Sequence, residues 1–332
     1  MKSPTNQNEI GSRSKIFLIL FFLTMLFSFT NSFAQTVKVF ARDNRIPTEK
    51  SILVDAKIYI SMCVSEGKVK INGWERNEIR AFVKQGSPVG FEIRKKNEQT
   101  KNPLWVEIVG LDTSSDKNIG AEECLSGEEI ELDVPRNATV DVKGSASETV
   151  INSVSKSLIK YVSGDIFLNN VAQGIEASTF EGDVTVENSS GAMNLTTTTG
   201  NIVAFNVSPK EIGDIFKSKT GSGAITLQQL QFGQTEANSN SGSIRFTGEV
   251  QNGAQYIFRT QNGSITLSIP QNSSGKLNAS YGFGAFNCEL PLKNVVKPNT
   301  SKTQSLTALL GTSGGATLNL ETFSGAIRIK KQ

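Results

Sequence analysis

The sequence predicts an all-β fold, a parallel β-solenoid with coils of about 20 residues that follows a further all-β region. Three observations support this prediction. A short glycine motif recurs through the second half of the chain, its copies are regularly spaced, and no long stretch has a helical period. The 332 residues are 37% hydrophobic, which is sufficient for a buried core.

The amino terminus has the three parts of a secretory signal peptide. Lys2, Arg13 and Lys15 precede the apolar run "IFLILFFLTMLFSF", and the small residues of "NSFAQ" follow it. We expect cleavage after Ala34, which removes residues 1–34. A retained membrane anchor is the alternative, but the run is shorter than the roughly 20 residues that span a bilayer. The sequence thus predicts an exported protein, placed in the periplasm, on the cell surface or in the medium, with no membrane span after cleavage.

Residues 35–150 form the first compositional region, which we interpret as all-β, either first coils or a cap. Apolar residues alternate at Val69 and Ile71 and again at Ile79, Ala81 and Val83, the period of a half-buried strand.

Residues 151–332 form a second region, rich in Ser, Thr, Asn and Gly. A glycine followed by a small residue and an apolar, any, apolar triplet recurs there, and we expect each glycine to form a turn. The predicted turn glycines are Gly164, Gly182, Gly191, Gly200, Gly223, Gly242, Gly263, Gly284 and Gly325.

The spacing of the motif predicts stacked coils. Gly164, Gly182 and Gly200 are 18 residues apart, and the next intervals are 23, 19, 21 and 21. Gly191 falls midway within one interval, so each coil should hold two strands. The last gap of 41 residues is interpreted as two coils, one with a degenerate motif. Equivalent residues of successive coils should stack into ladders.

A polar row precedes the glycines. Three positions upstream of each glycine lie residues that are mostly Thr or Ser. The members of this row are Tyr161, Thr179, Asn188, Thr197, Thr220, Ser239, Thr260, Tyr281 and Thr322.

The composition excludes several kinds of chemistry. With no histidine, triads that use imidazole and histidine-ligated zinc are ruled out. No phosphate-binding loop, dinucleotide fingerprint or calcium-loop motif occurs, so we predict neither cofactor nor metal. A net charge of +3 from 34 basic and 31 acidic residues gives no reason to expect nucleic acid as a partner.

Asp165 and Asp183 are the sharpest candidates for catalysis. One coil apart, they would lie roughly 5 Å from each other, a spacing that resembles a retaining glycosidase. The same position is filled by Asn201, Ser243 or an alanine in other copies, however, so we favour a turn role. We predict no catalytic residue. The competing hypothesis is a polysaccharide-active enzyme that uses Asp165, Asp183 and Lys160.

Three cysteines remain after the signal segment. Cys288 occupies an inward apolar position of the motif, where it should pack as a small hydrophobe. Cys63 and Cys124 are the candidates for a disulfide, with two free thiols as the alternative.

Four stretches between Gly67 and Ile329 carry a family resemblance: "GKVKINGWERNEIRAFV", "VAQGIEASTFEGDVTVENSSG", "GSITLSIPQNSSGKLNASYGFGAF" and "SGAIRI". In them the sequence resembles a bacterial family of adhesin-like domains of unknown function with glycine-rich β-solenoid repeats, the "putative adhesin" family. The resemblance implies a right-handed β-solenoid on or outside the cell envelope, with no established enzymatic activity. The chain departs from that pattern between Gln85 and Glu131, where a longer charged stretch is expected to hold a loop or a cap.

Between the two apolar positions of each motif lies an outward residue that is usually polar and uncharged. We therefore predict a non-catalytic adhesin-like protein that binds glycan or a cell-envelope protein through polar sheet faces. A partner of an envelope-stress signalling protein is a further alternative.

Overall fold

The computed structural model describes residues 48–88, 90–96, 103–111, 122–146, 148–297, 304–311 and 315–332. The predicted signal segment 1–34, with its cleavage point after Ala34, lies outside the described residues. Within the described ranges all regular structure is β-strand, and most strands pair in parallel. The prediction of an all-β fold with a parallel β-solenoid is confirmed.

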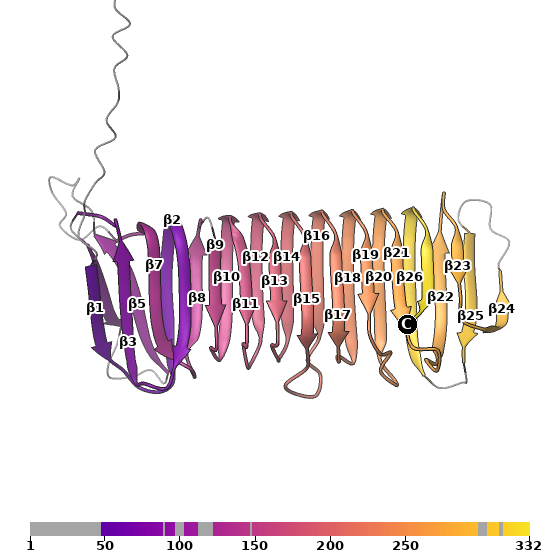
Figure 1. Ribbon diagram of the computed structural model, residues 1–332, viewed down its shortest axis with the longest axis horizontal. Coiled ribbons are helices and arrows are strands. Elements are labelled where there is room, and N and C mark those ends of the chain that lie inside the picture. The colour runs from indigo at the N-terminus through magenta and orange to yellow at the C-terminus, as the bar shows by residue number, and fades with distance from the viewer. Residues whose placement is uncertain are drawn as a thin grey trace, which may run out of the picture. The chain divides into compact units, whose positions relative to one another are not determined.

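Each regular coil has two strands, one in each of two parallel sheets that we call sheet I and sheet II (Figure 1). The strands of sheet I are β10 (Lys156–Ser163), β12 (Ile175–Glu181), β14 (Met193–Thr199), β16 (Phe216–Ser222), β18 (Gln234–Ser241) and β20 (Gln255–Asn262). Those of sheet II are β11 (Asp165–Asn169), β13 (Val184–Glu187), β15 (Ile202–Val207), β17 (Ile225–Leu230), β19 (Ile244–Thr247) and β21 (Ile265–Ile269). The glycine corner leads from sheet I into sheet II, and a second corner returns to the next coil.

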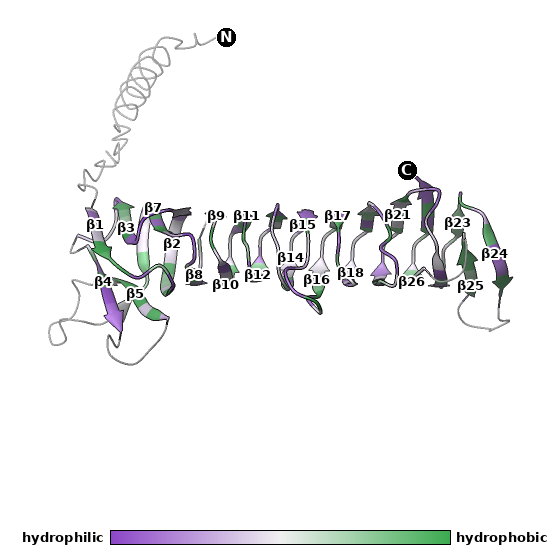
Figure 2. Ribbon diagram, turned by 90° about the horizontal axis from the view of Figure 1, so that it is seen from below, coloured by the Kyte–Doolittle hydropathy of each residue, from purple (hydrophilic) through white to green (hydrophobic). Residues whose placement is uncertain are grey.

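The two apolar positions of the motif form the inward rows of sheet II. Side chains alternate between buried and less buried positions along each strand. Hydropathy also changes from residue to residue along the strands (Figure 2). These rows join the inward rows of sheet I in one hydrophobic core. Burying an Ile or Leu side chain stabilises the fold by about 2 kcal/mol, so the stacked rows supply much of its stability. The fully buried members of the sheet II rows include Ile166, Val184, Ile202, Ile225, Ile244, Ile265, Ile327, Leu168, Val186, Leu227, Leu267 and Ile329.

At the amino-terminal end the order of the coils in space differs from their order in the chain. Strand β2 (Ile58–Trp74) belongs to both sheets, and its register shifts near Gly67, where it turns between them. One edge of β2 pairs with β5 (Leu104–Leu111) and β7 (Leu125–Pro135). The other edge pairs with β8 (Thr139–Gly144) and β9 (Glu148–Asn152). The first coil of the chain therefore lies second in the stack.

Antiparallel strands cover this end of the stack. Strand β1 (Thr48–Leu53) pairs with β3 (Glu78–Lys84), which pairs with β7, while β4 (Phe91–Lys96) and β6 (Glu122–Glu123) pair with β5. The outer strand β4 ends in Arg94, Lys95 and Lys96, and charged side chains on an edge strand discourage pairing with another chain. Strands β4 to β7 occupy the described part of the charged stretch between Gln85 and Glu131, so that stretch contributes to the cap.

The carboxy-terminal end repeats the arrangement. Strands β26 (Ala316–Ser324) and β27 (Ile327–Lys331) lie between β20 and β21 on one side and β22 (Gly275–Tyr281) and β23 (Phe286–Cys288) on the other. In Figure 1 the yellow last strands accordingly appear within the orange part of the stack. Beyond β22, strands β25 (Gln304–Leu310) and β24 (Leu292–Val296) are added antiparallel as a cap.

The interpretation of the 41-residue gap as two successive coils was wrong. Asn278 and Asn319, 41 residues apart, lie on adjacent strands with an amide hydrogen bond of 2.8 Å. The chain uses the intervening residues for the antiparallel cap and then returns to form the coil beneath it. A sheet edge that is covered by further strands is more favourable than an open edge. Unpaired backbone groups cost free energy when they are buried, and on an exposed edge they can pair with another chain.

Candidate binding site

The predicted turn glycines form one column along the glycine corner, with the exception of Gly191. A Cβ atom added to Gly200 would lie 2.0 Å from the carbonyl oxygen of Gly182, and Gly200 has a φ of 153°. Both the close contact and the dihedral require glycine. Gly191 precedes β14 and lies at the opposite corner beside Gly174, so it belongs to a separate column.

The polar row three positions before the glycines is the partner of that column. The hydroxyl of Thr197 donates to the carbonyl oxygen of Gly182 at 2.9 Å, and the hydroxyl of Thr322 donates to that of Gly263 at 2.8 Å. A buried carbonyl left unpaired would be destabilising, so the hydroxyl row stabilises each tight corner. The same bond is made by Thr220, Ser239 and Thr260.

Asp165 and Asp183 act on the backbone of the next coil. The Asp165 carboxylate accepts a hydrogen bond from the N–H of Asp183 at 2.8 Å, and Asp183 accepts one from the N–H of Asn201 at 2.7 Å. Asn201 continues the series by accepting from the N–H of Ala224 at 2.9 Å. These bonds join each glycine corner to the next coil, 18 or 23 residues along the chain, and do not close a local turn. Lys160, the third residue of the enzyme hypothesis, forms an ion pair with Glu176 at 3.3 Å.

The cysteines lie at the two ends of the stack. Cys63 on β2 and Cys124 just before β7 are joined by a disulfide, which links the inserted first coil to the strands that cover it. Cys288 is a free thiol on β23, half-buried against the core, and its burial raises the pKa of the thiol. It is less enclosed than its counterparts because, among the strands that the structure describes, β23 pairs with β27 alone.

Tyrosine ends the hydroxyl row toward the amino terminus. The hydroxyl of Tyr161 lies 2.8 Å from that of Thr149, and burial raises the pKa of Tyr161 to about 12.

Among the described residues no group of three or more His, Cys, Asp or Glu is placed to hold a metal ion. In the same part of the chain no helix has the length and apolar character that crossing a membrane requires.

The second corner carries a ladder of side-chain amides. Asn188 and Asn206 have positive φ angles of 47° and 52°, which asparagine tolerates better than most residues. The Asn206 amide donates to the side-chain oxygen of Asn188 at 2.8 Å, and Asn188 donates to that of Asn169 at 3.1 Å. Gln229 takes the next corner with a φ of 56°.

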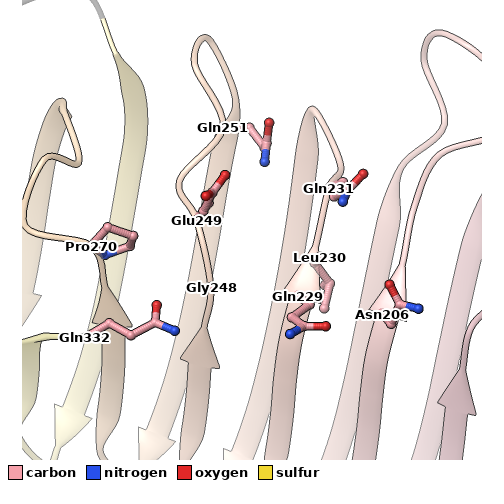
Figure 3. Close-up of a pocket in the computed structure, with 9 residues that line it drawn as sticks. All are labelled: Asn206, Gln229, Leu230, Gln231, Gly248, Glu249, Gln251, Pro270 and Gln332. Carbon is pink, nitrogen blue, oxygen red and sulfur yellow. The ribbon is translucent and has the colours of Figure 1, made fainter.

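Where the amide ladder reaches Gly248, which has no side chain, a hollow of about 470 Å³ opens (Figure 3). Amides from successive coils line it, and Glu249 is its charged residue. We call this hollow the amide pocket, and its lining is Asn206, Gln229, Leu230, Gln231, Gly248, Glu249, Gln251, Pro270 and Gln332.

A larger hollow of about 650 Å³ lies on the outward face of sheet I beside the glycine corner, and we call it the trough. Two rows of outward side chains form it across β16, β18, β20, β26 and β22. The first row consists of Lys219, Asn238, Arg259, Glu321 and Ser280, which are register neighbours in that order. The second row consists of Gly221, Asn240, Gln261 and Phe323, each two positions before a corner glycine.

The trough combines charge, amides and an aromatic wall. Arg259 and Glu321 form an ion pair at 3.2 Å, while no ion pair of Lys219 with another described residue occurs. Phe323 is 53% exposed and packs edge to face against Phe283, which is 81% exposed, at 5.4 Å between ring centroids. A contiguous exposed apolar patch, such as this pair of rings, marks an interaction site more often than a single exposed side chain does.

Sequence reasoning missed the trough. The signal was present in the outward positions two and four residues before each glycine, where Lys219, Arg259 and Glu321 bring charge into a mostly neutral repeat. Their assembly could not be predicted because Glu321 and Phe323 come from the last coil, whose place in the stack differs from its place in the chain.

The fold and its surface define a class: a two-sheet parallel β-solenoid with capped ends and polar hollows on its outer faces. A family profile described as Toastrack DUF4097 matches residues 66–330. The chain belongs to this family. No curated protein matches the sequence.

Solved structures show remote similarity. A "putative adhesin" from Parabacteroides distasonis ATCC 8503 has a TM-score of 0.43 and 8% identity, with 87% of this chain and 98% of that chain covered. A "putative adhesin" from Bacteroides fragilis NCTC 9343 has a TM-score of 0.37 and 14% identity, with coverages of 86% and 97%. A "putative cell adhesion protein" from Clostridium sporogenes ATCC 15579 has a TM-score of 0.26 and 13% identity, with coverages of 86% and 100%.

Proposed function

We propose that the protein is exported and acts as a non-catalytic, adhesin-like binding protein of the cell envelope or surface, with glycan or an envelope protein as its ligand. The observation that carries this proposal is the outward face of sheet I, where a regular array of polar side chains is hollowed into the trough. Ligand sites are typically concave and hold a few convergent polar groups beside apolar ones.

The chemistry of the repeat supports a binding role over a catalytic one. Asp165 and Asp183, the candidate acids, each accept a backbone hydrogen bond at the glycine corner. In the trough, Glu321 is paired with Arg259. General acid and base catalysis requires a carboxyl group within reach of the reacting bond and free to exchange a proton.

Localisation tests the first part of the proposal. Cell fractionation combined with protease treatment of intact cells should find the mature chain outside the cytoplasm, with a new amino terminus at Gln35. Accessibility to protease in intact cells would indicate the surface, and protection would indicate the periplasm. A full-length chain in the cytoplasm would contradict export.

A screen of purified protein against glycans and envelope proteins tests the second part. We expect binding without release of reducing sugar, and we expect Asp183→Asn to change neither, since an asparagine at the equivalent Asn201 makes the same backbone bond. Polysaccharide turnover that is lost in Asp183→Asn would overturn the non-catalytic assignment. Absence of any ligand in the screen would contradict the binding role.

A further inference from the structure

We propose that the trough binds an acidic polysaccharide, in particular a uronic-acid segment that runs across the strands along the axis of the coils. This inference rests on the proposed function, because it assumes that the protein is a binding module, and it specifies the site and the ligand chemistry. The trough is formed by residues from successive coils, which repeat about every 4.8 Å. A sugar unit in an extended polysaccharide is of similar length, so successive sugars can meet successive coils.

The polar rows suit sugar hydroxyls and carboxylates. Asn238, Asn240 and Gln261 offer amide donors and acceptors on neighbouring strands. Lys219 stands at the end of the first row, exposed and without an ion pair to another described residue. Arg259 is fixed by Glu321, which leaves its remaining guanidinium N–H groups available. The charges of Lys219 and Arg259 exceed that of Glu321, so a carboxylate is the favoured ligand group.

The aromatic wall supplies the apolar contact. Phe323, held edge to face by Phe283, presents a ring beside Gln261 and Glu321. The C–H face of a sugar ring can pack on it, which buries apolar area on both partners. On the same row Gly221, which also lines the trough, has no side chain.

The paired sheet beneath the trough favours a glycan over an extended peptide. Strands β16, β18, β20, β26 and β22 are hydrogen-bonded to neighbours on both edges, so no free strand edge is presented at the trough. A peptide bound by strand addition needs such an edge for its own backbone groups. A polysaccharide has no backbone amide to satisfy, and its outer hydroxyls remain in water.

Isothermal titration of the full chain with a short oligogalacturonate tests the assignment, and the methyl ester of the same oligosaccharide is the uncharged control. We expect Lys219→Gln and Phe323→Ala each to weaken binding about tenfold, as does loss of a charge-assisted or stacking contact. Binding should also weaken as salt is raised. The methyl ester should bind about tenfold more weakly than the acid.

Two matched substitutions control for general effects. Lys217→Gln removes a second exposed lysine from the same strand and the same face, outside the lining of the trough. Phe180→Ala removes a 55% exposed phenylalanine from the equivalent position of a distant coil. Both variants should bind like the parent protein.

The outcomes separate this inference from the proposed function. If the screen finds a neutral glycan or a protein ligand whose affinity is unchanged in Lys219→Gln and Phe323→Ala, the trough assignment falls and the binding role stands. Equal binding of acid and methyl ester would also overturn the acidic-sugar assignment. If no glycan or envelope protein binds and the chain stays in the cytoplasm, both fail.

Discussion

The two ends of the solenoid share one arrangement, but different contacts stabilise it at each end. At each end the terminal coil of the chain is inserted beneath strands that lie further inside the sequence, β2 beneath β5 and β7, and β26 with β27 beneath β22 and β23. The amino-terminal insertion is held by a disulfide and by the ion pairs of Lys68 with Glu148 and of Lys70 with Glu131. The carboxy-terminal insertion continues the glycine column and the hydroxyl row. An inserted end cannot fray without breaking two strand interfaces, which an ordinary outermost coil would not require.

The largest expected effect is at the carboxy-terminal insertion. A Cβ atom on Gly325 would lie 1.9 Å from the carbonyl oxygen of Gly263, and Gly325 has a φ of 157°. We expect Gly325→Ala to destabilise the protein by about 3 to 5 kcal/mol, since clash and strain combine. Chemical denaturation measures this. Gly233→Ala is the control, because no atom lies within 4 Å of its added Cβ. Equal stability of the two variants would show that the column does not constrain the inserted coil.

The disulfide is the corresponding element at the amino-terminal end. Cys63 and Cys124 are 61 residues apart, and a bridge that closes a loop of such length contributes about 3 to 4 kcal/mol. In Cys63→Ser/Cys124→Ser, we expect hydrogen exchange to accelerate in β2, β5 and β7 and to stay unchanged in β26 and β27. If exchange became faster at both ends, the two insertions would not be stabilised independently of each other.

A single hydroxyl of the row should have an intermediate effect. Thr322→Val removes the bond to the Gly263 carbonyl and should cost about 1 to 2 kcal/mol, whereas Thr322→Ser should retain most of the stability. Thr235→Val should have the opposite sign and stabilise by up to about 1 kcal/mol. The buried Thr235 hydroxyl has no hydrogen-bond partner among the described residues, and valine is of nearly the same shape. Thermal unfolding of the three variants shows which property determines stability at the inward positions: the hydrogen bonding of the side chain or its size.

The smallest expected effects belong to the ion pairs. Arg80 near the amino-terminal end binds Asp133 at 2.8 Å, Asp133 is only 14% exposed, and the hydrogen bond with Asp133 raises the pKa of Arg80. Arg259 and Glu321 are 54% and 61% exposed. Double-mutant cycles should give about 1 kcal/mol for the first pair and below about 0.5 kcal/mol for the second. A larger coupling for the exposed pair would reverse this ranking, and high salt should weaken the exposed pair more.

The sequence was informative wherever structure depends on neighbours one coil away. The glycine column, the hydroxyl row and the small residues after each glycine could be predicted from spacing, because the bond from Thr197 to Gly182 recurs with Thr or Ser in several coils. The insertions at the two ends could not be predicted. They depend on pairing between segments that are far apart in the chain. The motif in residues 316–329 would be the same whichever strands it paired with, so it does not reveal the position of this coil in the stack.

The same limit explains why the trough was missed. Its rows are regular only along the order of the coils in space, where Arg259 is followed by Glu321 and then by Ser280. In chain order Ser280 follows Arg259, and Glu321 stands apart. Which outward side chains of a solenoid lie side by side can be inferred only when the stacking order of the coils is known.

That stacking order is the central claim, because it places Glu321 and Phe323 in the trough, and cross-linking tests it directly. Two variants carry Cys288→Ser and retain Cys63 and Cys124. One adds Arg259→Cys with Glu321→Cys, and the other adds Arg259→Cys with Ser280→Cys. A disulfide requires Cα atoms within about 7 Å, which adjacent strands allow and a strand between them prevents. After mild oxidation, peptide mapping should find the 259–321 bridge and no 259–280 bridge. A 259–280 bridge without the 259–321 bridge would show that the coils stack in chain order and would contradict the account.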